Sequence, residues 1–253
     1  MEPVYSTVIG AGQLLFRGLG LRITLDGDEN VPTTGPVVLA SNHVSFLDFA
    51  LVGLAARRSR RYVRFLTRYD VWHAPIAGRL MNRMRHIPVD RAAPAAAYLT
   101  ARAMLRGGEA VGVFPEAGVS TSFTVRSLMP GAVALAAESG APLLPMVIWG
   151  PQRIYTADLP RDLTRGRPVS LLLGSPMYVG RHADVVAETR RLGRTLQGML
   201  DDVQARAQHQ PDPGEHAPWH PAHLGGHAPT PEQARLVETV PRSSVPPSWL
   251  ASP

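Results

Sequence analysis

Short apolar runs alternate with longer amphipathic stretches through most of this chain. Runs of four to seven residues rich in valine, isoleucine and leucine are bounded by glycine, proline or polar residues, and they predict β-strands. The stretches between them carry helical spacing or an opening proline, and they predict helices. The predicted strands span 22–26, 35–40, 62–67, 86–89, 110–114, 143–149 and 169–173, and the predicted helices span 46–56, 75–84, 94–106, 130–138 and 184–207.

This alternation of strands and helices sets the expected fold class. Strands separated by helices of about ten residues are typical of a mostly parallel sheet with helices on both faces. We therefore predict one α/β domain over residues 22–207. Its last helix has the clearest periodicity, because apolar residues recur at steps of three and four from Val185 to Val203.

The two ends of the chain differ from this domain. Residues 1–21 are mostly apolar and predict an N-terminal helix that either lies on a membrane surface or packs as the first core helix. No apolar run reaches the roughly 18 uncharged residues of a spanning helix. Residues 208–253 hold ten of the 24 prolines and five of the nine histidines, and they predict an extended or disordered tail. No carboxylate pattern accompanies these histidines, so no metal site is predicted.

Composition excludes several kinds of chemistry. The chain contains no cysteine, which rules out disulfides, thiolate metal sites and a cysteine nucleophile. All 26 basic residues are arginine, so no lysine is present to form a Schiff base or act as a base. The first residues lack the basic start of a signal peptide, and no small-residue cleavage site follows the apolar segment, so a cytosolic address is expected.

Positive charge is concentrated in one part of the chain. Residues 57–91 contain ten arginines against two acidic residues, a surplus of +8 that exceeds the net charge of +6. Such a cluster favours an anionic partner: a phosphate ester, an acidic membrane leaflet, an acidic carrier protein or nucleic acid. Aromatic residues make up only 6% of the chain, and only Tyr62 and Phe65 lie among the arginines in a way suited to base stacking. Nucleic acid is therefore not expected.

A histidine and an aspartate follow the predicted strand 35–40, in the segment Ser41-Asn42-His43-Val44-Ser45-Phe46-Leu47-Asp48. The ends of strands are where α/β proteins usually place chemistry. Five residues are slightly more than one helical turn, so the side chains of His43 and Asp48 can meet if a helix begins there. A carboxylate on one ring nitrogen would fix the tautomer of the imidazole and support it as a base.

Three more blocks follow in order, and together the four resemble the glycerolipid acyltransferase family over roughly residues 20–150. The blocks are Asn42-His43-x-Ser45-x-x-Asp48, Ile87-Pro88-Val89-Asp90-Arg91, Phe114-Pro115-Glu116 and Leu144-Pro145-Met146-Val147. A histidine and an aspartate at this spacing arise often by chance. The ordered set, in which the first block follows a predicted strand, the second and third each end one and the fourth lies in one, makes coincidence improbable.

The resemblance implies a reaction and a role for each residue. His43, oriented by Asp48, would deprotonate a hydroxyl of a lysophospholipid, which then attacks the thioester of acyl-CoA or acyl carrier protein. The implied acceptor is 1-acylglycerol-3-phosphate, giving phosphatidate, and no cofactor is needed beyond the acyl donor. Arg91 would bind the acceptor phosphate, and Glu116 would shape the acceptor pocket. The other expected substrate-binding residues of the blocks are Asn42, Ser45, Phe114 and Pro115. The expected location is the cytoplasmic face of the cell membrane, where the enzyme would bind peripherally to an anionic surface.

One departure from the family pattern concerns the acceptor. The third block of the family usually runs Phe-Pro-Glu-Gly-Thr-Arg-Ser, whereas here Glu116 precedes Ala117-Gly118-Val119-Ser120. Val119 stands where the arginine is expected, and Arg126 is the candidate to replace it. Three alternatives stay open: a different lysolipid or glycolipid acceptor, a hydrolase that uses the same dyad on water, and a basic protein that binds membranes without catalysis.

Overall fold

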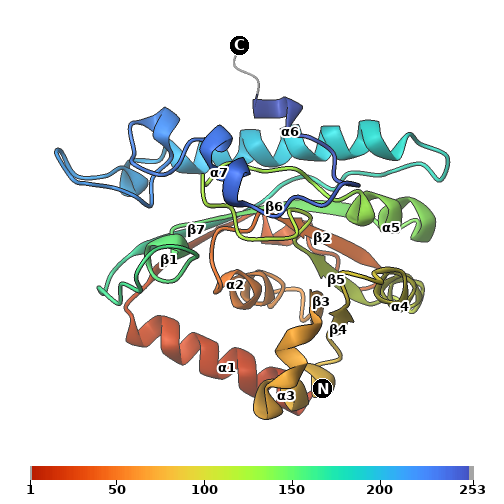
Figure 1. Ribbon diagram of the computed structural model, residues 1–253. Helices are drawn as coiled ribbons and strands as arrows, with labels where there is room; N and C mark the ends of the chain where they lie inside the picture. The colour runs from red at the N-terminus through yellow and green to blue at the C-terminus, as the bar shows by residue number, and fades with distance from the viewer. Residues whose placement is uncertain (1, 251–253) are drawn as a thin grey trace.

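A seven-stranded sheet forms the centre of the protein, seen in a computed structural model that describes residues 2–250 (Figure 1). Its strands lie in the order β1-β7-β6-β2-β5-β3-β4. All neighbouring strands are parallel except β6 and β7, which are antiparallel. The prediction of a mostly parallel α/β sheet is confirmed. The strands are β1 (Arg22–Asp26), β2 (Val37–Ser41), β3 (Val63–Arg68), β4 (Ile87–Val89), β5 (Ala110–Val113), β6 (Leu143–Trp149) and β7 (Pro168–Leu173).

One face of the sheet is covered by α2 (Asp48–Ala55), and α1 (Pro3–Gly18) and α3 (Pro75–Arg83) lie beyond it (Figure 1). Helix α1 packs inward through buried Tyr5 and Phe16, and the Tyr5 hydroxyl donates to the carbonyl of Val63 at 2.8 Å. The outer side of α1 exposes Leu14 and Leu15, which are 67% and 52% accessible. The N-terminal helix is therefore both a core-packing element and a source of exposed apolar surface. Within residues 2–250, no helix is long and apolar enough to cross a bilayer.

The opposite face is covered by α4 (Ala95–Arg106), α5 (Gly131–Ser139) and α6 (Val185–Gln204). Helix α6 begins at Asp184, whose side chain accepts hydrogen bonds from the backbone N–H groups of Val186 and Ala187. The apolar residues that predicted this helix form its buried side. Those buried against the sheet and α5 are Leu192, Leu196, Leu200 and Val203.

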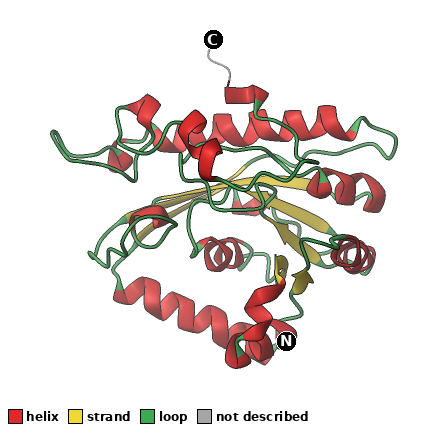
Figure 2. Ribbon diagram, in the orientation of Figure 1, coloured by secondary structure: helices red, strands yellow, loops and turns green. Residues whose placement is uncertain are grey.

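Residues 208–250 fold onto the face that α6 covers, which differs from the predicted disordered tail (Figure 2). They contain short 3-10 turns and α7 (Pro231–Val237), which Thr230 and Gln233 cap reciprocally. His209 and His220 are fully buried. The prolines prevent a long periodic helix, so the apolar residues of this segment are spaced irregularly. The hydrophobic periodicity of residues 208–250 therefore does not predict that they pack on the domain. Burial of their apolar side chains nevertheless stabilises their position.

Four of the ten arginines of residues 57–91 pair with carboxylates, and three of these four, Arg58, Arg64 and Arg85, pair with acidic residues outside this part of the sequence. Arg64 is 1% exposed and pairs with both Glu2 and Glu109, and Arg85 pairs with the same two carboxylates. Burial of Arg64 requires such partners, because an unpaired buried charge is costly. Within residues 2–250, the members of the cluster with no carboxylate within 4 Å are Arg57, Arg60, Arg61, Arg79, Arg83 and Arg91.

Candidate active site

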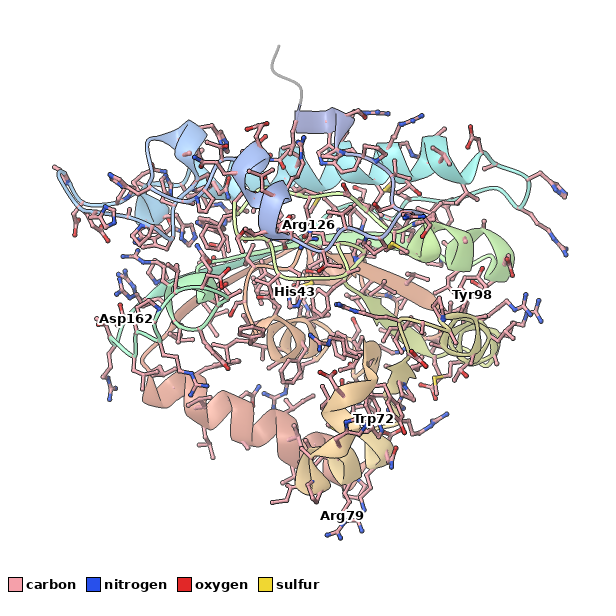
Figure 3. All side chains as sticks on the ribbon, in the orientation of Figure 1. His43, Trp72, Arg79, Tyr98, Arg126 and Asp162 are labelled. Atoms are coloured by element: carbon pink, nitrogen blue, oxygen red, sulfur yellow. The ribbon has the colours of Figure 1, made fainter. Side chains whose placement is uncertain are left out.

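The first three sequence blocks meet at the carboxyl-terminal ends of the parallel strands, here called the edge of the sheet. Strands β2, β5, β3 and β4 are adjacent and parallel, so the segments that follow them emerge on the same side. His43 follows β2, Glu116 follows β5 and Arg91 follows β4. Figure 3 shows His43 near the centre of this edge. The fourth block lies inside β6, where Pro145 is buried beside β2.

His43 and Asp48 form a hydrogen-bonded pair. The His43 Nδ1 atom lies 2.9 Å from Oδ2 of Asp48, as the five-residue spacing allows. The same oxygen accepts the backbone N–H groups of Val44 and Ser45, each at 2.8 Å, which holds the carboxylate in place. The Asp48 side chain is inaccessible, whereas that of His43 is 20% exposed. Nδ1 therefore faces the carboxylate, and Nε2 is left as the nitrogen that can act as a base.

Burial raises the pKa of the Asp48 carboxyl, and the hydrogen bond from His43 is the largest effect opposing that rise. The backbone N–H groups of Ser45 and Val44 act in the same direction as His43. These three donors all favour the ionised form, because each points at one carboxylate oxygen. The arrangement is that of a carboxylate which orients an imidazole and stabilises its protonated form.

Glu116 joins the segment after β5 to the turn that follows β2. Its Oε1 accepts the backbone N–H of His43 at 2.7 Å, and its Oε2 accepts that of Arg126 at 2.9 Å. Burial raises the pKa of Glu116 to about 8, against the lowering effect of these two donors. Both oxygens of Glu116 are thus bound by backbone N–H groups, and its role in shaping the acceptor pocket stays a prediction.

Two residues of the third block support the imidazole and the loop after β5. The ring of Phe114 stacks on that of His43, with centroids 4.4 Å apart and an interplanar angle of 23°. Phe114 is in turn parallel to Phe65, with centroids 6.0 Å apart. Pro115 is buried, and its carbonyl accepts the N–H of Met129 at 2.7 Å. Phe114 is therefore placed against the imidazole of His43, whereas Pro115 holds the backbone of the loop.

Asn42 and Ser45 are structural as well, in contrast to the expectation that they bind substrate. Asn42 is fully buried, and its amide exchanges two hydrogen bonds with the backbone of Ile148, at 3.0 Å and 2.7 Å. The pairing of β2 with β6 is thereby extended beyond Ser41. Buried Ser45 donates to the carbonyl of Tyr155 at 2.6 Å and accepts from the N–H of Leu47. Both side chains fix the turn that carries His43.

Arg91 is exposed and lies beside the turn after Glu116. Its Nη2 donates to the carbonyl of Ala117 at 2.8 Å, which brings the ends of β4 and β5 together. Ala117 has a φ of 55°, in the left-handed region that glycine adopts more easily. The family pattern has glycine at this position, so the strain at Ala117 is a local consequence of this chain's own sequence.

Arg126 does not supply the guanidinium that is missing at Val119. Its Nε lies 3.3 Å from Glu238, its Nη2 donates to the carbonyl of Thr239, and its Nη1 donates to the carbonyl of Val119. The Arg126 and Glu238 side chains are only 8% and 5% exposed. The expectation that Arg126 binds substrate is corrected for this reason.

Sequence reasoning missed two positions near the site. The N–H of Ser120 donates to the carbonyl of His43 at 2.7 Å, and Glu238 reaches Arg126 from a segment predicted to be disordered. Neither has a local signal, since a backbone contact and a partner more than 100 residues away leave no motif. Among residues 2–250, no group of histidine and acidic side chains is arranged to hold a metal ion.

Comparison with known proteins gives consistent similarities. A family model described as Acyltransferase matches residues 22–149. The chain is 29% identical over 175 residues to "1-acyl-sn-glycerol-3-phosphate acyltransferase LPAT1, chloroplastic" of Arabidopsis thaliana, covering 67% of this chain and 47% of that protein. It is 26% identical to the 1-acyl-sn-glycerol-3-phosphate acyltransferase of Bacillus subtilis, covering 66% and 79% of the two chains. The chain thus spans about half the length of its plant relative.

A solved structure has the same fold. The crystal structure of the 1-acyl-sn-glycerophosphate (LPA) acyltransferase PlsC from Thermotoga maritima superposes with a TM-score of 0.67, covering 80% of each chain. The two sequences are 20% identical, so this similarity bears on the fold alone.

Proposed function

The chain belongs to the acyltransferase family, and we propose that it transfers a fatty acyl group from acyl-CoA or acyl carrier protein to the free hydroxyl of 1-acylglycerol-3-phosphate, giving phosphatidate. The observation that carries the proposal is the contact of 2.9 Å between His43 and buried Asp48 at the edge of the sheet where Arg91 also emerges. The two relatives named above are 1-acyl-sn-glycerol-3-phosphate acyltransferases, which supports this choice of acceptor.

In the proposed reaction, Nε2 of His43 takes the proton of the acceptor hydroxyl. The oxygen attacks the thioester carbonyl, a carbon–oxygen bond forms, and the carbon–sulfur bond breaks to release the thiol carrier, which receives the proton. Asp48 accepts the Nδ1–H throughout and stabilises the imidazolium that forms in between. No residue of the protein is acylated in this scheme, so the absence of a cysteine is no obstacle.

The acceptor phosphate is the proposed ligand of Arg91. One guanidinium nitrogen is held by the carbonyl of Ala117, and the exposed side chain has further N–H groups available. A charge-assisted hydrogen bond of this type contributes about 1.5–3 kcal/mol. With Val119 in place of an arginine and Arg126 engaged by Glu238, this chain has fewer cations at the loop than the family pattern supplies. A lysolipid acceptor other than a phosphomonoester is therefore the second candidate.

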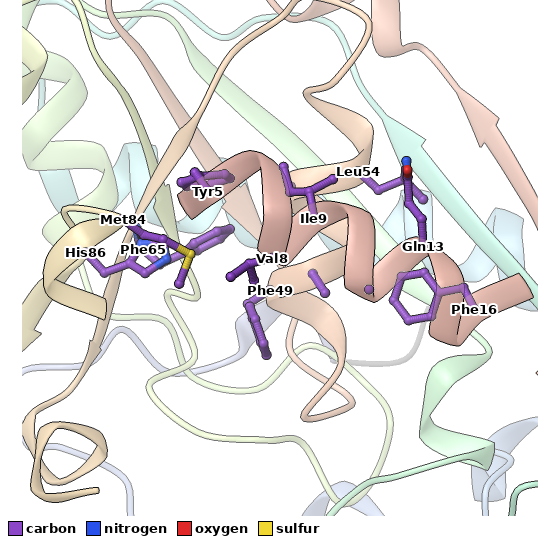
Figure 4. Close-up of a pocket in the computed structure, with 13 residues that line it drawn as sticks. Tyr5, Val8, Ile9, Gln13, Phe16, Phe49, Leu54, Phe65, Met84 and His86 are labelled. Atoms are coloured by element: carbon purple, nitrogen blue, oxygen red, sulfur yellow. The ribbon is translucent and has the colours of Figure 1, made fainter. Parts of the chain in front are cut away.

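An apolar groove between α1 and α2 is the proposed path for an acyl chain (Figure 4). Val8 and Phe49 line it from the two helices, and Phe65 of β3 lines it as well. The ring of Phe65 is 6.0 Å from that of Phe114, which stacks on His43. A continuous row of aromatic rings thus runs from the groove to the base. Burial of methylene groups there would stabilise a bound chain by about 0.8 kcal/mol each.

The proposed location is the anionic surface of the cytoplasmic leaflet. Helices α1 and α3 lie side by side, and together they expose Leu14, Leu15 and Ile76. Arg79 and Arg83 on α3 are exposed as well, and Figure 3 shows Arg79 projecting outward. Exposed apolar and cationic side chains on two neighbouring helices suit an anionic bilayer. We expect the protein to sediment with anionic liposomes at low salt, and Ile76→Asp to weaken that binding; wild-type protein that stays in the supernatant would contradict the proposal.

The decisive experiment offers one acyl-CoA with lysophosphatidate, glycerol phosphate and neutral lysophospholipids in parallel. Purified protein is expected to form phosphatidate from lysophosphatidate, and His43→Ala is expected to reduce the rate to background. His182→Ala is the matched control, because His182 is exposed and lies far along the chain. Release of free fatty acid with both substrates present would support a hydrolase instead. If a diacyl product formed only with another lysolipid, the acceptor would belong to that class of lysolipid.

A further inference from the structure

The C-terminal residues 238–250, here called the strap, bind the loop of residues 117–128 that follows the third block. Glu238 accepts the N–H and the hydroxyl of Thr121, each at 3.2 Å, and lies 3.3 Å from the guanidinium of Arg126. Further along the strap, Val245 pairs with Leu128 through two backbone hydrogen bonds of 2.7 Å and 3.1 Å. The strap therefore holds this loop at Thr121, Arg126 and Leu128.

Trp249 completes the attachment of the strap. Its indole N–H donates to the carbonyl of Val125 at 3.0 Å, and its ring lies against Gly193 of α6. A Cβ at Gly193 would come within 2.5 Å of that ring, so α6 is shaped to accept it. The strap lies outside residues 22–149, the part of the chain that the family model matches.

The inner side of the same loop holds the backbone of His43. Ser120 donates its N–H to the carbonyl of His43, and Glu116 joins the N–H of His43 to that of Arg126. Both backbone groups of the dyad residue are thus bound by this loop and the residue before it. Any displacement of residues 117–128 would be transmitted to the imidazole.

The loop is also in a conformation that needs external support. Ala117 and Phe123 have φ values of 55° and 58°, which are unfavourable for residues that carry a Cβ. Such conformations persist only where surrounding contacts outweigh their cost. On the α6 side, Gln204 donates to the carbonyl of Phe123 at 2.9 Å. On the outer side, the support comes from the strap.

We propose that the strap, and Glu238 in particular, is a positioning element for the catalytic pair. Through Arg126 and Thr121 it holds residues 117–128 in the conformation that fixes the backbone of His43. Arg126 and Glu238 are both nearly inaccessible, so removal of Glu238 would leave the Arg126 guanidinium buried without its counter-charge, which is costly. This inference deepens the proposed acyl transfer and rests on it for its kinetic readout only.

The test compares Glu238→Ala and Glu238→Gln with Glu232→Ala, a matched control on exposed α7 surface. Amide hydrogen exchange is measured at His43, Ser120 and Arg126 in the free protein, and kcat and KM are measured for both substrates. For Glu238→Ala we expect exchange at these amides to rise about tenfold or more. We expect kcat to fall about tenfold with KM changed less than about twofold, because a small misplacement of a base affects turnover more than binding. Glu238→Gln keeps an oxygen that can accept from Thr121. We therefore expect a smaller rise in amide exchange and a smaller loss of kcat than in Glu238→Ala.

Unchanged exchange at His43 and Ser120 in folded Glu238→Ala would overturn the inference, even if turnover fell. If wild-type protein transferred no acyl group, the proposed function would fail, while the exchange data would still decide the role of Glu238. Trp249→Phe provides a milder second variant should Glu238→Ala not fold. It removes only the hydrogen bond to Val125, and it is expected to raise exchange at Ser120 and Arg126 relative to wild type; wild-type exchange there would count against the strap.

Discussion

The backbone N–H of His43 donates to Oε1 of Glu116 at 2.7 Å, although the two residues are 73 positions apart. This bond joins the turn after β2 to the end of β5. The second oxygen of the same carboxylate binds Arg126, so one side chain connects three segments at the edge of the sheet. His43 is therefore held through its backbone by Glu116 and through its ring by Asp48.

Asp48→Asn is expected to lower turnover by about 100-fold or more. The variant loses the negative charge of the carboxylate but keeps the position of its oxygen beside His43. Two backbone N–H groups point at the Oδ2 position, so an asparagine oxygen would occupy it and still accept from Nδ1 of His43. The imidazolium would then lack its counter-charge. Steady-state kinetics measure the effect, and Asp70→Asn on the exposed surface is the control. Wild-type turnover in Asp48→Asn would contradict the assigned role.

Ala117→Gly is expected to stabilise the protein by about 1 kcal/mol. Glycine adopts a φ of 55° without the clash that a Cβ causes, and part of that gain is lost to the greater entropy of glycine in the unfolded chain. Urea unfolding measures the difference. Ala92→Gly nearby, where φ is not positive, should be neutral or destabilising. If Ala117→Gly were less stable than wild type, the left-handed backbone of Ala117 would not carry the energetic cost that we assign to it.

Glu116 should make stability depend on pH with a defined sign. Its pKa is raised from 4.5 to about 8 in the folded protein, so between these values the folded state binds a proton that the unfolded state has lost. Its contribution is fully present below pH 4.5 and disappears as pH rises through 8, with a slope of up to about 1.4 kcal/mol per pH unit. Urea unfolding of wild type and Glu116→Gln from pH 5 to 8.5 measures it. A difference between the two proteins that stays constant over this range would refute the assignment.

Trp219→Ala tests whether residues 208–250 pack as the structure describes. Its ring is 7% exposed, lies 3.7 Å from the guanidinium of Arg153 and donates its N–H to Glu215. We expect a loss of roughly 3 kcal/mol in the free energy of unfolding. Leu236→Ala on the 86% exposed side of α7 should change it by less than about 0.5 kcal/mol. Equal, small effects from both variants would indicate that the segment is detached.

Local patterns predicted most of the fold correctly because they report on local causes. The apolar runs became strands β1 to β7, and the spacing of leucines defined the buried side of α6. The side chains of His43 and Asp48 are in contact because a helix begins at Asp48. The arginine cluster was a weaker guide, since charge counted along residues 57–91 does not include Glu2 and Glu109, which the fold brings to Arg64.

The sequence by itself determined the α/β class, the strand ends and the contact between His43 and Asp48, since periodicity and short spacing act within a few residues. Only the tertiary structure decided that Asn42, Ser45 and Glu116 bind backbone groups, and that residues 238–250 close over the loop beside His43. Every buried polar group must find a partner, and the partner is set by which strands are neighbours and what packs over them. These partners lie about 70 to 120 residues apart in the chain, so no local sequence pattern records them.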